Sequence, residues 1–258
     1  MMGYDEQQLR RLSKLAIRTG QRLLQHGAES KLVVDLAQRV GRALGADAVE
    51  LSLNSNSMVA TVIIGDECMT TTRRCPDAGI NMTVITELQQ LCLQAESGKL
   101  DIDGFEQAIE NLSSFKYNRH LVAVMIGLSC ACFARLAGGD WAVFSLTFVA
   151  SSVAMAVRQR LGLLHFNPLV NFFVTALVAT SVSLLGVRYA IGNDPHIAMA
   201  SSVLLLVPGV PLINAVSDMV KGYIDMGVAR WVFATMLTLA TSIGIIAAVG
   251  LWGGSMHV

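Results

Sequence analysis

Residues 204–222 read LLLVPGVPLINAVSDMVKG, and two prolines interrupt this otherwise apolar segment. Pro208 and Pro211 lie three apart, and Asn214 and Asp218 follow at helical spacing. A proline removes a backbone donor, and in lipid an unpaired carbonyl costs several kcal/mol unless protein or water satisfies it. The consequence of the missing backbone donors therefore depends on whether the segment lies in water or in lipid.

The composition indicates a membrane protein with two dissimilar parts. The 258 residues are 53% hydrophobic and only 15% charged, whereas roughly a quarter of residues are charged in soluble domains. Residues 1–120 hold 13 of the 19 Lys and Arg and 15 of the 19 Asp and Glu. We therefore expect an N-terminal part in water and a C-terminal part in a lipid bilayer. Zero net charge without a basic patch argues against a nucleic-acid partner.

The second part predicts a membrane all-α bundle of five transmembrane helices, formed by residues 116–258. Each apolar segment is close to the roughly 20 residues that cross the hydrocarbon. The segments are 119–137, 141–161, 168–190, 196–220 and 229–252.

Positive residues predict the orientation, because they are retained on the cytoplasmic side. Six of them fall on one side of the five spans, and two, Arg135 and Arg188, fall on the other. The six are Lys116, Arg119, Arg158, Arg160, Lys221 and Arg230. We expect a cytoplasmic N-terminal domain and a periplasmic C-terminus.

Residues 1–115 predict a cytoplasmic α+β domain. Apolar residues recur at helical spacing in 7–24 and 29–44, and further helices are expected over about 82–96 and 104–113. Between them, VELSLNS, SMVATVII and ECMTTTRR are typical of strands, the last two forming a hairpin at Gly65 and Asp66. Asp103 with Glu106 three residues later predicts a capping box.

The stretch QHGAES, residues 25–30, joins the first two predicted helices. Gly27 fits the left-handed position just after a helix end. His26 suits the negative end of the first helix, and Glu29 suits the positive start of the second. Capping alone explains this motif.

The broken segment supports a substrate-site hypothesis. Pro211 is suited to the first position of a second half-helix, with Gly209 and Val210 as the unwound link, leaving amides free to bind an anion. Pro211, Asn214, Asp218 and Lys221 would share one face, so we expect the fourth span to bend around a small carboxylate solute. Two alternatives stay open: a kink used only for packing, and an Asp218 at the cytoplasmic interface paired with Lys221.

Other polar residues give weaker signals. Asn171 and Thr175 lie four apart in the third span, and Asn171 is a second candidate for binding because an amide is hard to satisfy alone. Cys130 and Cys132 face different sides of a helix, so no metal site is expected. No phosphate-binding loop is present, and we expect no cofactor and no direct use of ATP.

Several motifs in order give the chain a family resemblance. LLQHGAES (23–30), TTTRR (70–74), GINM (79–82), GLSCACF (127–133) and SSVLLLVPGVPLINAVSDM (201–219) resemble the bacterial threonine/serine exporter family, over nearly the whole chain. The resemblance is to its split form, in which a larger protein and a small membrane partner divide the spans. It implies export across the inner membrane of threonine and serine, or of succinate and related C4-dicarboxylates.

Two other function classes are weighed against a secondary exporter. A membrane-anchored hydrolase, or a gate, would use His26, Glu29, Arg73 and Arg74 of the cytoplasmic domain, but no nucleophile motif accompanies them. A non-transporting regulatory subunit would use its small residues only for packing. We expect an exporter subunit, not an enzyme, for which a small membrane subunit, or a homo-oligomer of this chain, supplies the remaining spans.

Overall fold

The computed structural model describes residues 2–112 and 117–253. Cα packing divides the chain into two compact units. The first unit contains Met1–Phe115 and Val210–Val232, and the second contains Lys116–Gly209 and Phe233–Val258. The segment that follows the proline break thus packs with the N-terminal domain, so this unit includes part of the fourth and fifth predicted spans.

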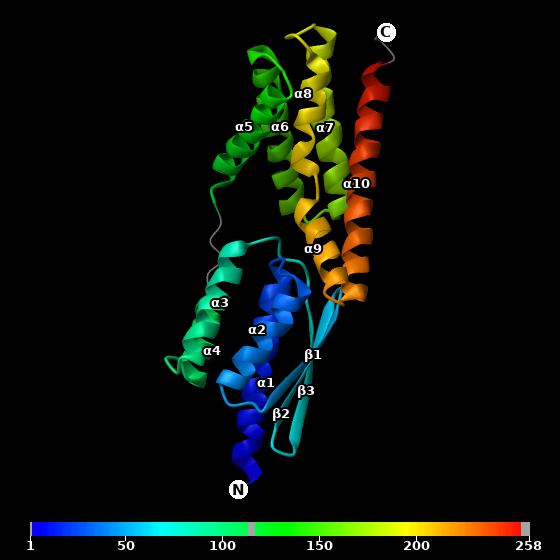
Figure 1. Cartoon of the computed structure of the whole chain (residues 1–258). Coiled ribbons are helices and arrows are strands. Elements are labelled where there is room, and N and C mark those ends of the chain that lie inside the picture. The colour runs from blue at the N-terminus through cyan, green and yellow to red at the C-terminus, as the bar shows by residue number, and fades with distance from the viewer. Residues whose placement is uncertain (1, 113–116, 254–258) are drawn as a thin grey trace. The chain divides into compact units, whose positions relative to one another are not determined.

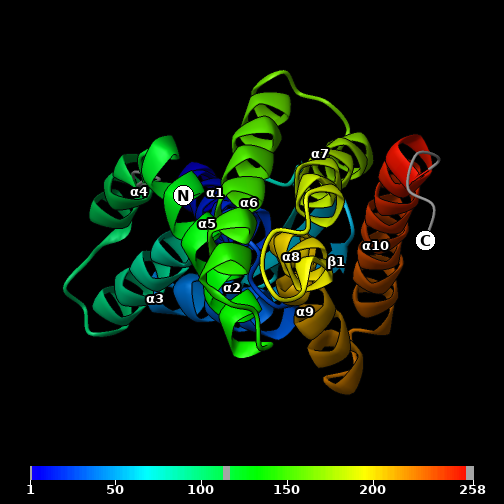
Figure 2. The ribbon, with the colours of Figure 1, turned by 90° about the horizontal axis from the view of Figure 1, so that it is seen from above.

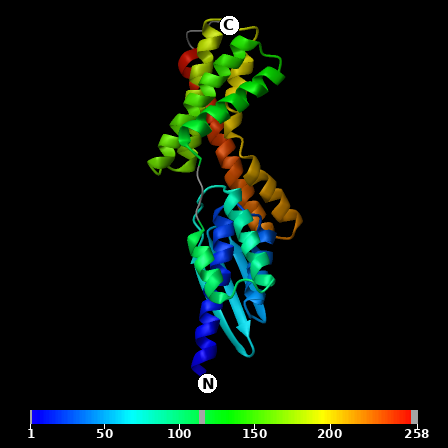
Figure 3. The same cartoon turned by 90° about the vertical axis from the view of Figure 1, so that its left-hand side faces the viewer.

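A three-stranded antiparallel sheet lies beside the helices of the first unit (Figure 3). The strands are β1 (Ala48–Asn54), β2 (Ser57–Ile64) and β3 (Glu67–Arg74), in that order. On β2, Met58, Ala60 and Val62 alternate inward and are fully buried. This alternation gives the sheet one apolar face, and the predicted strands and hairpin are confirmed.

Two helices cover that face of the sheet. Helix α1 (Met2–Gln25) contacts β2 and β3, and α2 (Ser30–Ala43) contacts β1. Their apolar stripes supply buried residues such as Leu12, Ile17 and Val33. Helices α3 (Met82–Glu96) and α4 (Ile102–Asn111) pack against these helices and complete the α+β core (Figure 1).

The predicted capping box at Asp103 is wrong. Helix α4 begins two residues earlier than this box implies, and its N-cap is Asp101, whose side chain accepts a hydrogen bond from the Gly104 amide. Asp103 and Glu106 instead form ion pairs with Arg11 of α1. Both carboxylates therefore attach α4 to α1, a contact between distant residues that local spacing does not reveal.

The second unit is a helical bundle in which α5 to α8 are neighbours when viewed from above (Figure 2). They are α5 (Arg119–Leu136), α6 (Trp141–Leu163), α7 (Pro168–Arg188) and α8 (Pro195–Ser202), and α10 (Ile224–Gly253) belongs partly to this unit. Buried hydroxyls hold three of them together, because Ser183 of α7 bonds Ser202 of α8 and Ser151 of α6 bonds the Ser202 carbonyl. Small polar residues of this kind are typical of packed membrane helices.

Within the described residues, four helices are long and apolar enough to span a membrane. They are α5, α6, α7 and α10. A fifth span results if the broken pair Pro195–Leu206 and Gly209–Val220 counts as one. The chain is thus a mostly helical multi-pass membrane protein with four or five candidate spans.

The break in the fourth segment lies slightly earlier than the sequence suggested. A 3-10 turn, η1 (Leu204–Leu206), follows α8, and α9 (Gly209–Val220) begins at Gly209. The link is therefore Val207 and Pro208, and Pro211 is the third residue of α9 instead of the first. A proline is tolerated there because a first-turn residue needs no backbone donor.

Candidate functional site: the latch and the broken span

Side chains of α9, of Lys221 just after it and of α10 bind three residues of the loop that joins α1 to α2, and the first residue of α2. We call this set of contacts the latch. It consists of Gly27, Ala28, Glu29 and Ser30 on the loop side and of Asn214, Ser217, Asp218, Lys221 and Arg230 on the other. All nine residues belong to the first unit. Two motifs about 190 residues apart in the sequence therefore form one polar network.

The geometry of the loop prepares it for these contacts. The Ala28 amide donates to the Leu23 carbonyl at 3.0 Å and the Gly27 amide to the Leu24 carbonyl at 3.2 Å. These two bonds, with Gly27 at φ +88°, form a Schellman end to α1, as the glycine predicted. The chain then turns directly into α2, and the carbonyls of Gly27 and Ala28 accept bonds from the latch.

Asp218 provides the N-terminal cap of α2 from another helix. Its carboxylate accepts the Ser30 amide at 2.8 Å and the Ser30 hydroxyl at 2.9 Å. Glu29, the N-cap residue by position, makes no side-chain cap bond. A helix start has unpaired amides and a positive dipole end, so a carboxylate placed here satisfies both.

Arg230 of α10 balances the buried charge of Asp218. Asp218 is fully buried, and one guanidinium nitrogen of Arg230, Nη1, lies 3.3 Å from its Oδ2. The other, Nη2, donates to the Ala28 carbonyl at 2.8 Å. Nη1 has the distance of an ion pair but no aligned hydrogen bond within the described part of the chain. Removing either partner would leave the other buried without its countercharge.

The outer half of the latch is more exposed. Asn214 donates to the Gly27 carbonyl at 2.8 Å, and the carboxylate of Glu29 accepts bonds from Ser217 at 2.7 Å and Lys221 at 2.6 Å. The bonds from Lys221 and Ser217 hold the pKa of Glu29 below its usual value. Asn214, Asp218 and Lys221 thus share one face of the segment, as the spacing predicted. Asp218 pairs with Arg230, however, and Lys221 pairs with Glu29.

The remaining candidates of the N-terminal domain lie outside the latch. His26 is buried, and its Nδ1 lies 2.7 Å from the Arg22 carbonyl. This contact agrees with the expected role at the end of α1, since a carbonyl requires that Nδ1 carry the proton. Arg73 and Arg74 are exposed residues at the end of β3. The structure does not bring these three residues together into one site.

In the second unit, residues that do not belong to the latch lie near the break. The Leu205 carbonyl, in the 3-10 turn just before Pro208, accepts a bond from Arg158 Nη1 at 2.9 Å. Asn171 donates to the Arg158 carbonyl at 3.2 Å, and Thr175 donates to the Asn171 carbonyl at 2.6 Å. Asn171 therefore links α7 to α6, whereas the bond of Thr175 lies within α7. The predicted binding of a solute by these two residues stays a prediction.

Sequence reasoning missed several of these residues. It found Asn214, Asp218, Lys221 and the QHGAES motif but not their contact, and it used Arg158 and Arg230 only to predict the orientation of the spans. Helical spacing reports which residues share one helix face and is silent about what that face meets. The one available signal was the opposite charge of Glu29 and Lys221, which many other pairs share.

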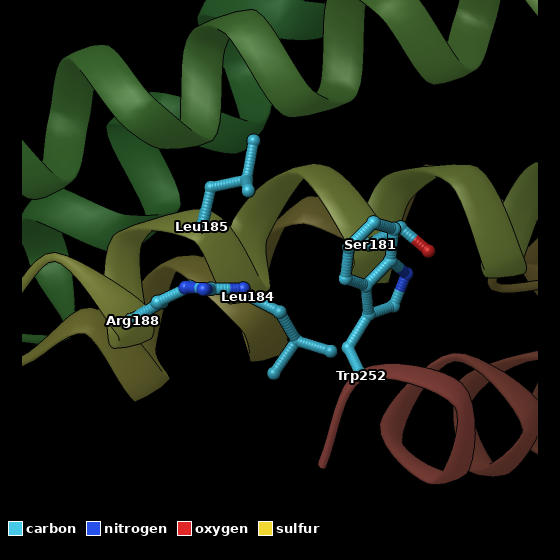
Figure 4. Close-up of a pocket in the computed structure, with 5 residues that line it drawn as sticks. All are labelled: Ser181, Leu184, Leu185, Arg188 and Trp252. Atoms are coloured by element: carbon cyan, nitrogen blue, oxygen red, sulfur yellow. The ribbon is translucent and has the colours of Figure 1, made fainter. Parts of the chain in front are cut away.

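A small pocket lies elsewhere in the second unit, between α7 and α10 (Figure 4). It is lined by Ser181, Leu184, Leu185, Arg188 and Trp252. Figure 4 shows the indole of Trp252 beside Ser181, whose hydroxyl has no hydrogen-bond partner within the described chain. The pocket is too small for a solute larger than water, so it is no substrate site in this conformation. No group of three or more metal-ligating side chains occurs among the described residues.

Comparison with known proteins assigns the chain to a family. The ThrE family model, described as "Putative threonine/serine exporter", matches residues 14–252. The chain belongs to the threonine/serine exporter family. The match includes both halves of the latch and the broken span, so these features lie within the part that defines the family.

Relatives of this exporter family differ in length. A protein of Escherichia coli named "Probable succinate transporter subunit YjjP" is 50% identical over 96% of this chain and 97% of its own. A protein of Klebsiella aerogenes with the same name is 49% identical over 98% of each chain. The "Threonine/serine exporter" of Corynebacterium glutamicum is 23% identical over 96% of this chain but only 52% of its own. No solved structure matches the chain.

Proposed function

We propose that this chain is the larger subunit of an inner-membrane secondary exporter of small carboxylates, with succinate and related C4-dicarboxylates as its substrates. The observation that carries the proposal is full-length identity of about one half to two proteins named as succinate transporter subunits. The proposal assigns no catalytic residue and no cofactor to the chain.

The proposal includes five spans and one orientation. The broken pair counts as the fourth span, residues 1–115 form the cytoplasmic domain, residues 116–258 form the membrane domain, and the C-terminus is periplasmic. The distribution of positive residues supports this arrangement. One of them, Lys116, lies outside the described residues.

A partner subunit is part of the proposal. The word "subunit" in the relatives' names implies one, and an odd number of spans cannot form two equal halves of a transporter. The sequence resemblance to the split form implies a small membrane protein of the YjjB type. A homo-oligomer of this chain could supply further spans within the lipid bilayer.

We place the passage for the solute at the break and a gate at the latch. Pro208 and Gly209 end one half of the span and begin the next, and the amide of Val210 in the first turn of α9 has no partner within its helix. Such amides favour an anion such as a carboxylate. Pro211 lies in this first turn, and Asn171 and Thr175 of α7 are further candidates for binding the solute.

The latch would link the passage to the cytoplasmic domain. When closed, it engages Asn214 and Asp218 with the loop at 27–30. When it opens, the same amide and carboxylate become available to the solute and to a coupling proton. His26 and Glu29 then act as gate residues through the position of the loop, and Arg73 and Arg74 are assigned to its regulation.

A second substrate class has support from the same comparisons. Two relatives at 23–26% identity are named as threonine/serine exporters, one of them as probable. Threonine and serine also carry a carboxylate, so the amides at the break would suit them too. The higher identity to the succinate-named relatives favours succinate.

Excretion from cells tests the proposal. A bacterium that forms succinate but lacks related exporters would express this chain, the small partner, or both, and excreted succinate, threonine and serine would be measured. We expect succinate in the medium to rise only when both subunits are present. A rise in threonine alone would support the second class, and no rise in any of the three acids would contradict the proposal.

A further inference from the structure

Arg158 is a cation without an anion in the second unit. Its Nη1 donates to the Leu205 carbonyl at 2.9 Å, and its guanidinium lies over the ring of Phe172, 4.6 Å from the ring centre. Phe172 and its neighbour Leu206 belong to an apolar cluster of the bundle. Arg160, two residues later, is exposed instead. Arg158 is thus directed inward, to the break in the span.

The unit offers no carboxylate to this guanidinium. Its sequence contains two acidic residues, Asp140 and Asp194. Both are N-caps, of α6 and α8. Asp140 precedes Arg158 by 18 residues of the same helix, about 27 Å at 1.5 Å per residue. Within the described residues, no ion pair involves Arg158.

Arg158 is partly buried, and removing a charge from water is costly unless it is paired. A guanidinium has five donors, and within the described residues a carbonyl accepts from only one of those on Arg158. Its planar fork matches a carboxylate with two parallel bonds. Arg230 shows the contrasting case, since it is partly buried beside its own carboxylate partner, Asp218.

We infer that Arg158 binds a carboxylate of the transported acid at the break in the fourth span. This inference rests on the proposed export of small carboxylates and names the cation that recognises them. The bond from Asn171 to the Arg158 carbonyl fixes the helix at this residue, and the bond to Leu205 directs the guanidinium to the broken backbone. A solute carboxylate supplies the charge that the unit lacks.

Transport by liposomes containing this chain and the small partner tests the inference. The variants are Arg158→Gln, Arg158→Lys and, as a matched control from the same helix, Arg160→Gln. We expect Arg158→Gln to raise the KM for succinate by about tenfold or more, because a charge-assisted bond is lost. Arg158→Lys should raise it less, since the charge remains without the fork. Arg160→Gln should leave it near wild type.

A binding assay distinguishes recognition of the carboxylate by Arg158 from a purely structural role of this residue. Succinate and its uncharged diamide would each be added to the purified wild-type and variant complexes, and the shift in unfolding temperature would be measured. We expect succinate, but not the diamide, to stabilise the wild type and the Arg160→Gln protein, and we expect this difference to disappear in Arg158→Gln. If Arg158→Gln fails to assemble, Arg158→Lys and Arg160→Lys replace it and its control.

The outcomes distinguish the two proposals. If the wild-type complex transports succinate and Arg158→Gln retains both its KM and its preference over the diamide, Arg158 does not bind the carboxylate, while the proposed function stands. If the wild-type complex transports no carboxylate, the proposed function fails and the inference fails with it.

Discussion

Asp218 shows at the scale of one residue how a carboxylate in an apolar segment is used. Its two oxygens cap α2 through Ser30, and its charge is balanced by Arg230. The cost of burying the carboxylate is thereby offset by two hydrogen bonds and an ion pair. Because Ser30 and Arg230 belong to different helices, a movement of α2 away from α10 would break the contacts of Asp218, as the proposed gate requires.

Replacing Asp218 should therefore destabilise the protein. Asp218→Ala removes the cap of α2 and leaves the charge of Arg230 unpaired. We expect a loss of about 3–5 kcal/mol in the free energy of unfolding, measured by denaturation in mixed micelles. Asp225→Ala, at an exposed position in the first turn of α10, is the control and should cost less than about 1 kcal/mol. Equal losses for the two variants would show that Asp218 does not hold the latch.

Glu29 and Lys221 form an ion pair of the latch that connects two elements, the start of α2 and the end of α9. Because the pKa of Glu29 is lowered in the folded protein, its contribution is present above the usual glutamate value and is lost as pH falls through the lower folded-state value. Both side chains are about one third exposed, so solvent weakens the pair.

A double-mutant cycle of Glu29→Gln and Lys221→Met tests this pair. We expect a coupling of roughly 0.5–1 kcal/mol near neutral pH, measured from unfolding free energies. The coupling should decline toward zero in acid, where Glu29 is protonated. A coupling that is absent at neutral pH, or one that grows in acid, would contradict the assignment.

The break at Val207 and Pro208 separates the two halves of the fourth span. Pro208→Ala restores a backbone donor and removes a constraint of up to about 3 kcal/mol against a continuous helix. We expect slower succinate transport together with a higher unfolding temperature, measured on the reconstituted complex. Pro195→Ala is the matched control, because Pro195 is at the start of α8, where a proline is favourable. A variant at Pro208 that transports like wild type would show that the break is not needed.

The elements themselves could be predicted from sequence, whereas their contacts could not. Periodicity located the strands and most helices to within a few residues, since each depends on local spacing. The cap of α2 could not be found in this way, because it comes from Asp218, 188 residues away. The inward direction of Arg158 was missed for a related reason: positive charge near a span end predicts a side of the membrane, not a rotamer.

At the scale of the whole molecule, cysteine labelling tests the proposed orientation. Cys68 is exposed on β3, whereas burial raises the pKa of Cys92 to about 11. A membrane-impermeant maleimide at neutral pH should therefore label Cys68 in inside-out vesicles and leave Cys92 unlabelled. Right-side-out vesicles should give no label at Cys68, with Cys68→Ser as the control for site assignment. Labelling of Cys68 in right-side-out vesicles would show that the orientation is opposite to the one proposed.

Transport of an acid by two subunits is the central claim for the whole molecule. Counterflow tests it most directly: liposomes are loaded with unlabelled succinate or threonine, and entry of the labelled solute is measured for this chain alone, the small partner alone and both. The account predicts rapid counterflow of succinate only with both subunits, and slow counterflow of threonine. Counterflow of threonine without succinate, or no counterflow with both subunits present, would contradict it.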